Sequence, residues 1–268
     1  MTSLGWRGSP QRFLSDRLLA AQLPTIVAAY ARLRQGKDPI PPRDDLGQAA
    51  NYLYMQTGEV PDPDNARALD VYYILLTDHE MNASTFAARV TTGTLSDMTS
   101  AITSAIGTLK GPLHGGANQA AMEMMLEIGA LDKVEGYIRQ ALAEKKRIMG
   151  FGHRVYKTED PRTTVLRRLS KRLCENVGAS KWYQMSQRIE DLMIQEKGIN
   201  ANVDFYLASV LYALGIPPDL FTPVFACSRV VGWTAHVLEQ LADNRLIRPR
   251  AEYVGAMNLK YVPIEERQ

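Results

Sequence analysis

Cysteine is scarce in this sequence, since its 268 residues include only Cys174 and Cys227. No CxxC pair or Cys/His cluster accompanies them, so neither a disulfide framework nor a zinc site is indicated. Both cysteines fall within helical patterns, and two unpaired thiols are typical of a reducing compartment. We therefore expect a cytoplasmic protein with no resident metal ion.

The sequence also lacks a strong excess of charge and a long apolar run. Its formal net charge is +2, with acidic and basic residues interleaved, which argues against a nucleic-acid partner. No apolar segment approaches the ~20 residues that a membrane helix needs. Arg7, Arg12 and Arg17 precede no continuous apolar stretch, so no secretory signal is predicted. With 46% apolar residues, the chain is long enough for one large globular domain or two smaller ones.

Apolar residues recur with the period of a helix along nearly the whole chain and hardly anywhere with the period of a strand. Asp160-Pro161 is typical of a helix start, and Gly178 of a helix end. Asp132 and Glu135 have the spacing of a capping box. The predicted fold class is all-α. Further predicted helices cover residues 97–109, 180–197 (capped by Ser180 and closed by Gly198) and 224–241.

Three of the four histidines lie at breaks between predicted helices. His114 stands in GPLHGGAN, just before a helix that begins near Ala117. The positive end of that helix disfavours imidazolium, which favours a neutral His114 that can donate a hydrogen bond. His153 stands in GFGHR, and the cations that follow it suit an anionic ligand. Taken singly, these two motifs could also be an incidental turn and a solvated basic loop.

Four further residues have a functional and a bland interpretation. Asp204 could act as a base or simply cap the following helix, and capping is the commoner role. His79 could bind a ligand or end an apolar helix. Arg229 and Arg248 could bind an anion or be surface charges. His236 shares a helix face with Arg229, and we assign it no role. No HxH, HExxH, Walker or GxGxxG motif is present.

Taken together, six segments resemble the signature segments of the citrate synthase family, in the family's order and from about residue 17 to the end of the chain. Six matching segments are far more specific than any one of them. They are DHEMNAST (78–85), GPLHGGAN (111–118), GFGHRVYKTEDPR (150–162), NVDFY (202–206), SRVVGWTAHVLEQ (228–240) and RPRAEYVG (248–255).

The resemblance implies a two-domain helical fold with the active site in the cleft between the domains. Residues 1–111 would form the first part of the large domain, 112–220 the small domain and 221–268 the rest of the large domain. Members are dimers or larger assemblies, so we expect a homodimer. Typical members also carry additional N-terminal residues, and residues 1 to about 16 match no family segment.

The resemblance further implies condensation of acetyl-CoA with oxaloacetate and water to citrate and CoA, the entry to the tricarboxylic acid cycle, without a cofactor. Asp204 would be the base, while His114 and His153 would donate to the oxygens of the two reactants. Oxaloacetate would be bound by His79, Arg162 and Arg229, with Arg248 reaching in from the neighbouring subunit. The residues expected to contact CoA are Leu113, Gly115, Gly116, Ala117, Gly150, Gly152 and Lys157.

Two alternatives stay open. One is 2-methylcitrate synthase, which performs the same chemistry on propionyl-CoA. One additional methylene changes discrimination by only ~1–3 kcal/mol, so the pocket's details would decide. The other is a catalytically silent paralogue or partner subunit that kept the motifs. The presence of His114, His153, Asp204 and three arginines favours the enzyme.

Overall fold

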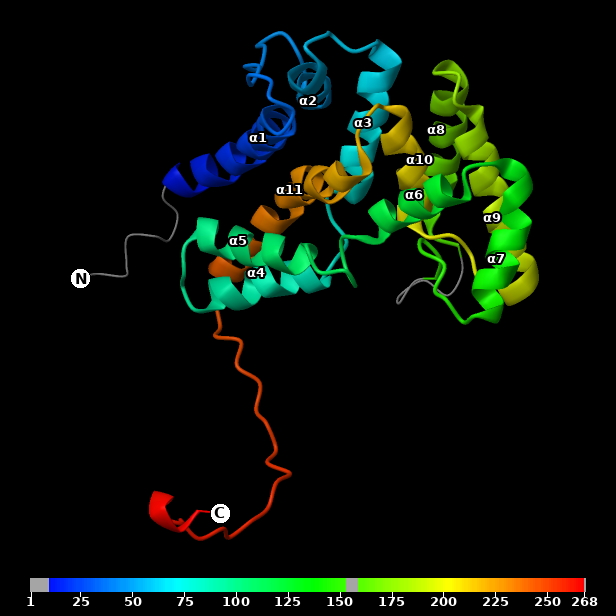
Figure 1. Cartoon of the computed structure of the whole chain (residues 1–268). Coiled ribbons are helices and arrows are strands. Elements are labelled where there is room, and N and C mark those ends of the chain that lie inside the picture. Colours follow the sequence, from blue (N-terminus) through cyan, green and yellow to red (C-terminus); the bar gives the residue numbers. More distant parts are fainter. Residues whose placement is uncertain (1–9, 153–158, 268) are drawn as a thin grey trace.

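The computed structural model describes residues 10–152 and 159–267, so the predicted site residues His153 and Lys157 lie outside the described residues. Within these ranges the chain is helical, and its only bridge of strand type is an isolated one between Phe151 and Ala201. The predicted all-α class is confirmed (Figure 1). The helices are α1 (Pro10–Leu33), α2 (Gln48–Thr57), α3 (Pro63–Leu76), α4 (Ala83–Gly93), α5 (Met98–Leu109), α6 (Ala117–Ile128), α7 (Val134–Ala143), α8 (Pro161–Asn176), α9 (Ser180–Lys197), α10 (Val203–Ala213) and α11 (Phe221–Ala242).

Five of the ten helices α2 to α11 begin after a residue whose side chain caps the helix. The carboxylates of Asp97 and Asp160 accept the backbone N–H of Ser100 and Arg162, as an N-cap should. Gly198 ends α9 in the left-handed conformation, as predicted. The start of α11 is three residues earlier than predicted.

Two predicted caps are wrong. Residues 131–133 form a 3₁₀ turn, and α7 begins at Val134 after Lys133, which makes no side-chain cap. Glu135 instead pairs with Arg139, at 3.0 Å. Ser180 is the first residue of α9 rather than its cap, and the preceding Ala179 has no side chain that could cap it.

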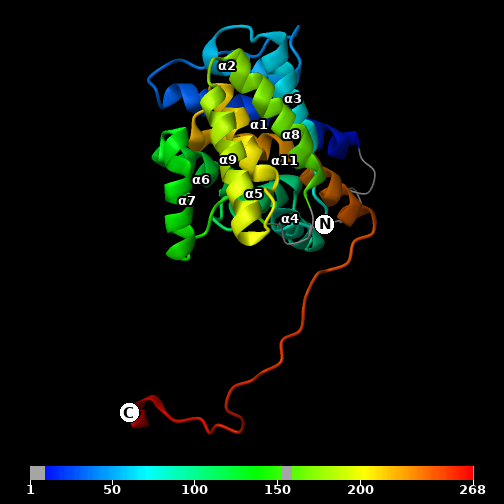
Figure 2. The same cartoon turned by 90° about the vertical axis from the view of Figure 1, so that its right-hand side faces the viewer.

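The helix α11 lies at the centre of one group of helices, in contact with α1, α3, α4 and α5. The helices α6 to α10 form a second group, in which α10 packs on α6 and α8, and α9 packs on α7 and α8. The two groups lie side by side in Figure 1, with α3 against α8 and α10 along their border. Residues 244–247 lie against Gly93 at the end of α4, and the chain that follows runs away from the body in both views (Figures 1 and 2).

The core is continuous through both groups and includes fully buried Trp233 of α11, Tyr72 of α3 and Tyr206 of α10. Because these large side chains come from helices that meet near the border, their packing fixes the helix ends that face it. None of the helices in the described ranges is long and apolar enough to cross a membrane.

Candidate active site

A cavity of about 500 Å³ lies where the two groups of helices meet. Its wall is built from five separate stretches of chain: the turn after α3, the turn before α6, the start of α8, the start of α10 and the first half of α11. Five residues predicted from the sequence line it, together with Leu113. They are His79, His114, Arg162, Asp204 and Arg229. The structure thus brings together residues that are up to 150 positions apart in the chain.

His114 is half-buried, and burial is the main reason why its pKa falls to about 4, with a further contribution from the positive charge of Arg229. The ring is therefore neutral at pH 7, as predicted. Its Nε2 lies 2.8 Å from Ser84 Oγ. Ser84 also accepts the indole N–H of Trp233, at 3.0 Å, and its hydroxyl lies 2.8 Å from Asn82 Oδ1.

Asp204 belongs to the first turn of α10, whose N-cap is Asn202 rather than Asp204. Asp204 is half-buried at the cavity wall, and the burial of its carboxyl group raises its pKa to about 6. The positive charges of Arg162 and Arg229 oppose the rise. A carboxylate with this pKa is still mostly ionised at pH 7 and binds a proton far more readily than an exposed aspartate does.

The two arginines of the cavity are held in different ways. Arg162 donates from Nε and Nη2 to the two oxygens of Asp160, at 3.0 and 2.7 Å, and Asp160 is only 1% exposed. Arg229 is 2% exposed and donates from Nε to the carbonyl of Leu76, at 2.7 Å. Burial lowers the pKa of Arg229 to about 10, so it stays charged at pH 7. Both guanidinium groups are thus fixed in orientation before any ligand arrives.

The segment before His153 is tied to the segment before Asp204. Gly152 donates its N–H to the carbonyl of Asn200, at 3.1 Å, and the amide of Asn202 donates back to the carbonyl of Gly152, at 2.8 Å. Gly150 has φ +82°, and a Cβ there would lie 2.8 Å from that of Phe205, so only glycine fits. Residues 150–152 therefore lie beside the start of α10.

A buried polar cluster that the sequence did not predict lies behind Asp204. The Tyr206 hydroxyl donates to Glu190 of α9 at 2.6 Å, and Arg167 of α8 donates to both oxygens of Glu190. The hydrogen bond and burial raise the pKa of Tyr206. Because the cluster joins α8, α9 and α10, it fixes the helix whose first turn carries Asp204.

The remaining predicted residues are more dispersed. Leu113 is 90% exposed at the cavity mouth, whereas Gly115 is buried, with its carbonyl bonded to Thr222. Gly116 and Ala117 begin α6. Arg248 is exposed in the segment that runs away from the body, and this structure does not bring it to the cavity.

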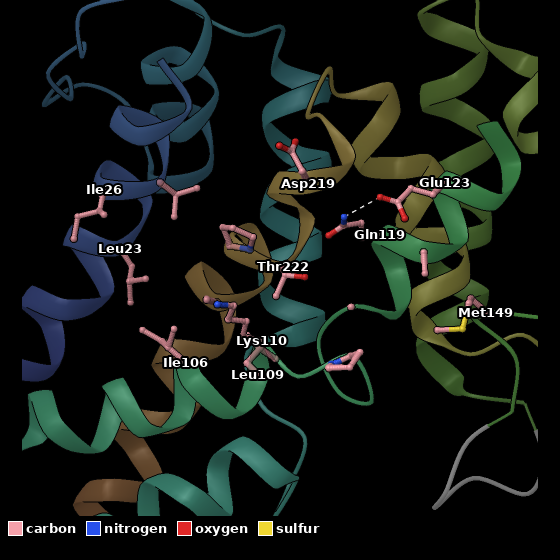
Figure 3. A pocket seen from close by; sticks show the side chains of 16 residues that line it. Leu23, Ile26, Ile106, Leu109, Lys110, Gln119, Glu123, Met149, Asp219 and Thr222 are labelled. Atoms are coloured by element: carbon pink, nitrogen blue, oxygen red, sulfur yellow. Dashed lines mark hydrogen bonds between the residues drawn. The ribbon is translucent and has the colours of Figure 1, made fainter. Parts of the chain in front are cut away.

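A larger, mostly apolar cavity of about 780 Å³ lies between α1, α5, α6 and α11 (Figure 3). Leu23, Ile26 and Ile106 point into it in Figure 3, and Gly116 and Met149 also line it. It contains neither a histidine nor an arginine, so it lacks the acid–base groups of the smaller cavity. The turn of residues 111–116 contributes to the walls of both cavities. In the described part of the chain, no three histidine, cysteine or acidic residues are grouped so that they could hold a metal ion.

Comparisons with known proteins agree with this geometry. Residues 7–250 match the family model described as citrate synthase, C-terminal domain. Citrate synthase 2 of Bacillus subtilis is 57% identical over 249 residues, which are 93% of this chain and 67% of that protein. A 2-methylcitrate synthase of Shewanella oneidensis is 44% identical, over 97% of this chain and 69% of that protein. The chain thus spans about two thirds of the length of these relatives.

A solved structure of citrate synthase from Thermoplasma acidophilum is also similar, with a TM-score of 0.87 and 37% identity. The match covers 99% of this chain and 72% of that one. That structure is described as a ternary complex with carboxymethyl coenzyme A and oxaloacetate.

Proposed function

This chain belongs to the citrate synthase family, and from that premise we propose that its cavity condenses acetyl-CoA with oxaloacetate and water to give citrate and CoA. One observation carries the proposal. A raised-pKa carboxylate, a neutral histidine and two buried arginines, from distant parts of the sequence, line the same cavity of about 500 Å³. This set suits removal of a carbon-bound proton beside an anionic substrate.

Asp204 is the proposed base, which takes a proton from the methyl group of the thioester. Such a proton has a pKa of roughly 20, so full transfer to a carboxylate of pKa about 6 is uphill by on the order of 20 kcal/mol. Burial of Asp204 removes only about 3 kcal/mol of this cost compared with an ordinary aspartate. A donor to the thioester oxygen must therefore supply most of the rest.

His114 is the proposed donor, and its hydrogen bond with Ser84 decides which ring nitrogen carries the proton. The single proton of the Ser84 hydroxyl can go to Asn82 Oδ1 or to His114 Nε2, but not to both. When it goes to Nε2, the ring carries its proton on Nδ1 and can donate from there. Rotation of one hydroxyl thus selects the imidazole tautomer that polarises the thioester.

The carbon nucleophile then attacks the ketone carbon of oxaloacetate, and the ketone oxygen takes a proton from His153. Water cleaves the C–S bond of the resulting citryl-CoA, which releases CoA as a thiol and citrate as a carboxylate. The reaction involves no change of oxidation state that would need a redox cofactor. The proposed contacts of CoA are Lys157, Gly150, Gly152 and the turn Leu113, Gly115, Gly116 and Ala117, which lies between the two cavities.

Oxaloacetate is a dianion, and the charge of the cavity supports a contribution from a second copy of the chain. Arg162 and Arg229 supply two positive charges, but Asp160 and Asp204 supply two negative ones. His79 adds a hydrogen-bond donor. A further cation would favour the dianion, and Arg248 is exposed and lies outside the lining of its own subunit's cavity. We therefore propose a homodimer in which Arg248 enters the partner's cavity, with residues 112–220 as the smaller domain.

Replacement of Asp204 by asparagine tests the function. We expect Asp204→Asn to abolish the release of free CoA thiol from acetyl-CoA and oxaloacetate, because the amide cannot accept the proton. Binding of oxaloacetate, measured by calorimetry, should persist because the arginines remain. Asp191→Asn, at an exposed position of α9, is the matched control and should keep full turnover. Substantial turnover in Asp204→Asn would remove Asp204 as the base.

The similarity to a 2-methylcitrate synthase supports propionyl-CoA as an alternative substrate. Parallel assays with acetyl-CoA and propionyl-CoA separate the two activities. A higher kcat/KM for propionyl-CoA would replace citrate by 2-methylcitrate as the product without changing the role of any residue above.

A further inference from the structure

One face of α11 holds the turn that carries His79. Arg229 donates to the carbonyl of Leu76, Trp233 donates to Ser84, and His236 contacts Asp78. These three residues recur at intervals of four and three, so they share one helix face. Gly232 lies beside them, and a Cβ there would overlap the carbonyl oxygen of Thr77. The turn is therefore pressed directly against the helix.

This turn is conformationally costly. Glu80 has φ +50°, in the left-handed region that side-chain-bearing residues rarely occupy. Two side chains hold it there from within the turn. Asp78 accepts the N–H of Glu80 on Oδ2, at 3.2 Å, and Asn82 donates to the carbonyl of His79, at 3.3 Å. If Asp78 is free to rotate, one of these two supports is lost.

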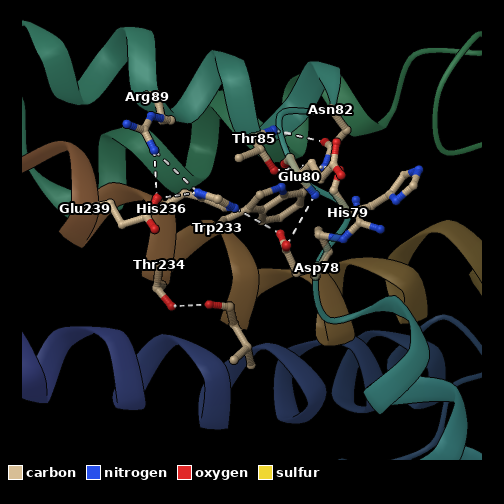
Figure 4. Close-up of polar contacts among 12 residues, drawn as sticks. Asp78, His79, Glu80, Asn82, Thr85, Arg89, Trp233, Thr234, His236 and Glu239 are labelled. Atoms are coloured by element: carbon tan, nitrogen blue, oxygen red, sulfur yellow. Dashed lines mark hydrogen bonds and ion pairs between the residues drawn. The ribbon is translucent and has the colours of Figure 1, made fainter. Parts of the chain in front are cut away.

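His236 prevents that rotation by binding the other oxygen of Asp78. Its Nε2 lies 3.1 Å from Asp78 Oδ1, while its Nδ1 lies 2.7 Å from Glu239 Oε2 (Figure 4). Arg89 of α4 donates to the same oxygen of Glu239, at 2.8 Å. In Figure 4, Asp78 is directed toward His236, whereas the neighbouring His79 points the other way.

The contact between His236 and Asp78 has a defined direction. An ionised carboxylate only accepts, so a hydrogen bond to Asp78 Oδ1 requires an N–H on Nε2 of the ring. Nδ1 faces the carboxylate of Glu239 and also the guanidinium of Arg89, whose Nη1 lies 3.4 Å away. The charged groups that face the ring are Asp78 from the turn, Glu239 from α11 itself and Arg89 from α4.

We propose that His236 is a positioning residue, whose ring binds Asp78 against α11 and thereby fixes the strained turn that presents His79 to the substrate carboxylate. This assignment rests on the proposed function only for the identity of the substrate. His236 is 16% exposed, whereas Asp78 and Glu239 are 48% and 62% exposed. Polar contacts so open to water contribute little to global stability, so the effect of this contact is local.

The test uses the full chain with His236→Ala, and with His236→Gln, whose amide can still donate to Asp78. Val231→Ala, on the exposed face of α11, is the matched control. In His236→Ala we expect the backbone amide of Glu80 to exchange its hydrogen about three- to tenfold faster, because a partly exposed charge-assisted hydrogen bond to Asp78 is lost. The dissociation constant of oxaloacetate should rise by a similar factor. For His236→Gln, the exchange rate and the dissociation constant should lie between those of His236→Ala and those of the unchanged chain.

Hydrogen exchange and oxaloacetate binding distinguish a failure of this proposal from a failure of the proposed function. If the unchanged chain does not bind oxaloacetate, the proposed function fails, and the exchange of residues 78–82 still decides whether His236 fixes the turn. Unchanged exchange in both His236 variants would overturn the proposal. Acceleration spread over the whole chain with a lower melting temperature would overturn it too, because it would show a general structural role.

Discussion

Replacing Gly232 by alanine tests how closely the site turn lies against α11. The new Cβ would overlap the carbonyl oxygen of Thr77 and lie 3.2 Å from Asp78 Oδ1. Because the obstacle is backbone, it cannot turn aside as a flexible side chain would. The turn would have to move outward by about 1 Å to reach ordinary contact distance, and His79 would move with it.

The expected magnitude combines two opposing terms. Alanine is favoured over glycine inside a helix by about 1 kcal/mol, whereas overpacking of a well-packed contact costs about 1–3 kcal/mol. The net destabilisation is therefore about 0–2 kcal/mol, or a fall of up to roughly 8 °C in melting temperature for a chain of this size. A displacement of 1 Å in a positioning group can lower activity by about a hundredfold.

Thermal unfolding and oxaloacetate titration of Gly232→Ala would measure both effects. Gly136→Ala is the matched control, since Gly136 also lies inside a helix but a Cβ there meets no atom within 4 Å. The control should be as stable as the unchanged chain or more stable, with the same affinity for oxaloacetate. If Gly232→Ala behaved like this control, the close approach of the turn to α11 would be refuted.

Three further predictions concern Asp204 and Arg248. Because Asp204 must be ionised to act as the base, kcat/KM should fall tenfold per pH unit below pH 6, the approximate pKa of Asp204. His114, with a pKa of about 4, stays neutral over this range. A pH profile without this decrease would contradict the assignment. Because the pKa of Asp204 is raised in the folded state, its ionised form destabilises the fold above pH 6, and this cost disappears as the pH falls toward 4. At pH 8, Asp204→Asn should therefore have a higher melting temperature than the unchanged chain. At pH 4, it should not. Arg248→Ala mixed with Asp204→Asn should regain part of the lost activity, because a mixed dimer contains one site with both residues; no recovery would place Arg248 in its own subunit's cavity.

Sequence reasoning located helix starts correctly where the side chains next to the start decide the conformation. Asp97 and Asp160 cap α5 and α8 because an aspartate oxygen reaches the N–H groups of the next turn whatever surrounds it. The predicted capping box of Asp132 and Glu135 is wrong because the chain forms a 3₁₀ turn there and Glu135 pairs with Arg139. The motif had the right spacing, but competing contacts decided the conformation.

Sequence reasoning assigned no role to His236, which lies inside a helix rather than at a break, and it did not single out Ser84. A signal was present, since Arg229, Trp233, His236 and Gln240 repeat at helical spacing on one face of an otherwise apolar helix. Such a face must find polar partners when it is buried, and the partners proved to be Leu76, Ser84, Asp78 and Arg89.

By itself, the sequence predicted the helical class, several helix ends and a candidate set of reactive residues, since periodicity, capping and the six signature segments are local properties of the chain. Only the tertiary structure decided that His79, His114, Arg162, Asp204 and Arg229 share one cavity. It also decided that burial raises the pKa of Asp204 and lowers that of His114. The physical reason is that a pKa shift depends on desolvation and on charges nearby in space, and both arise only when distant segments pack together.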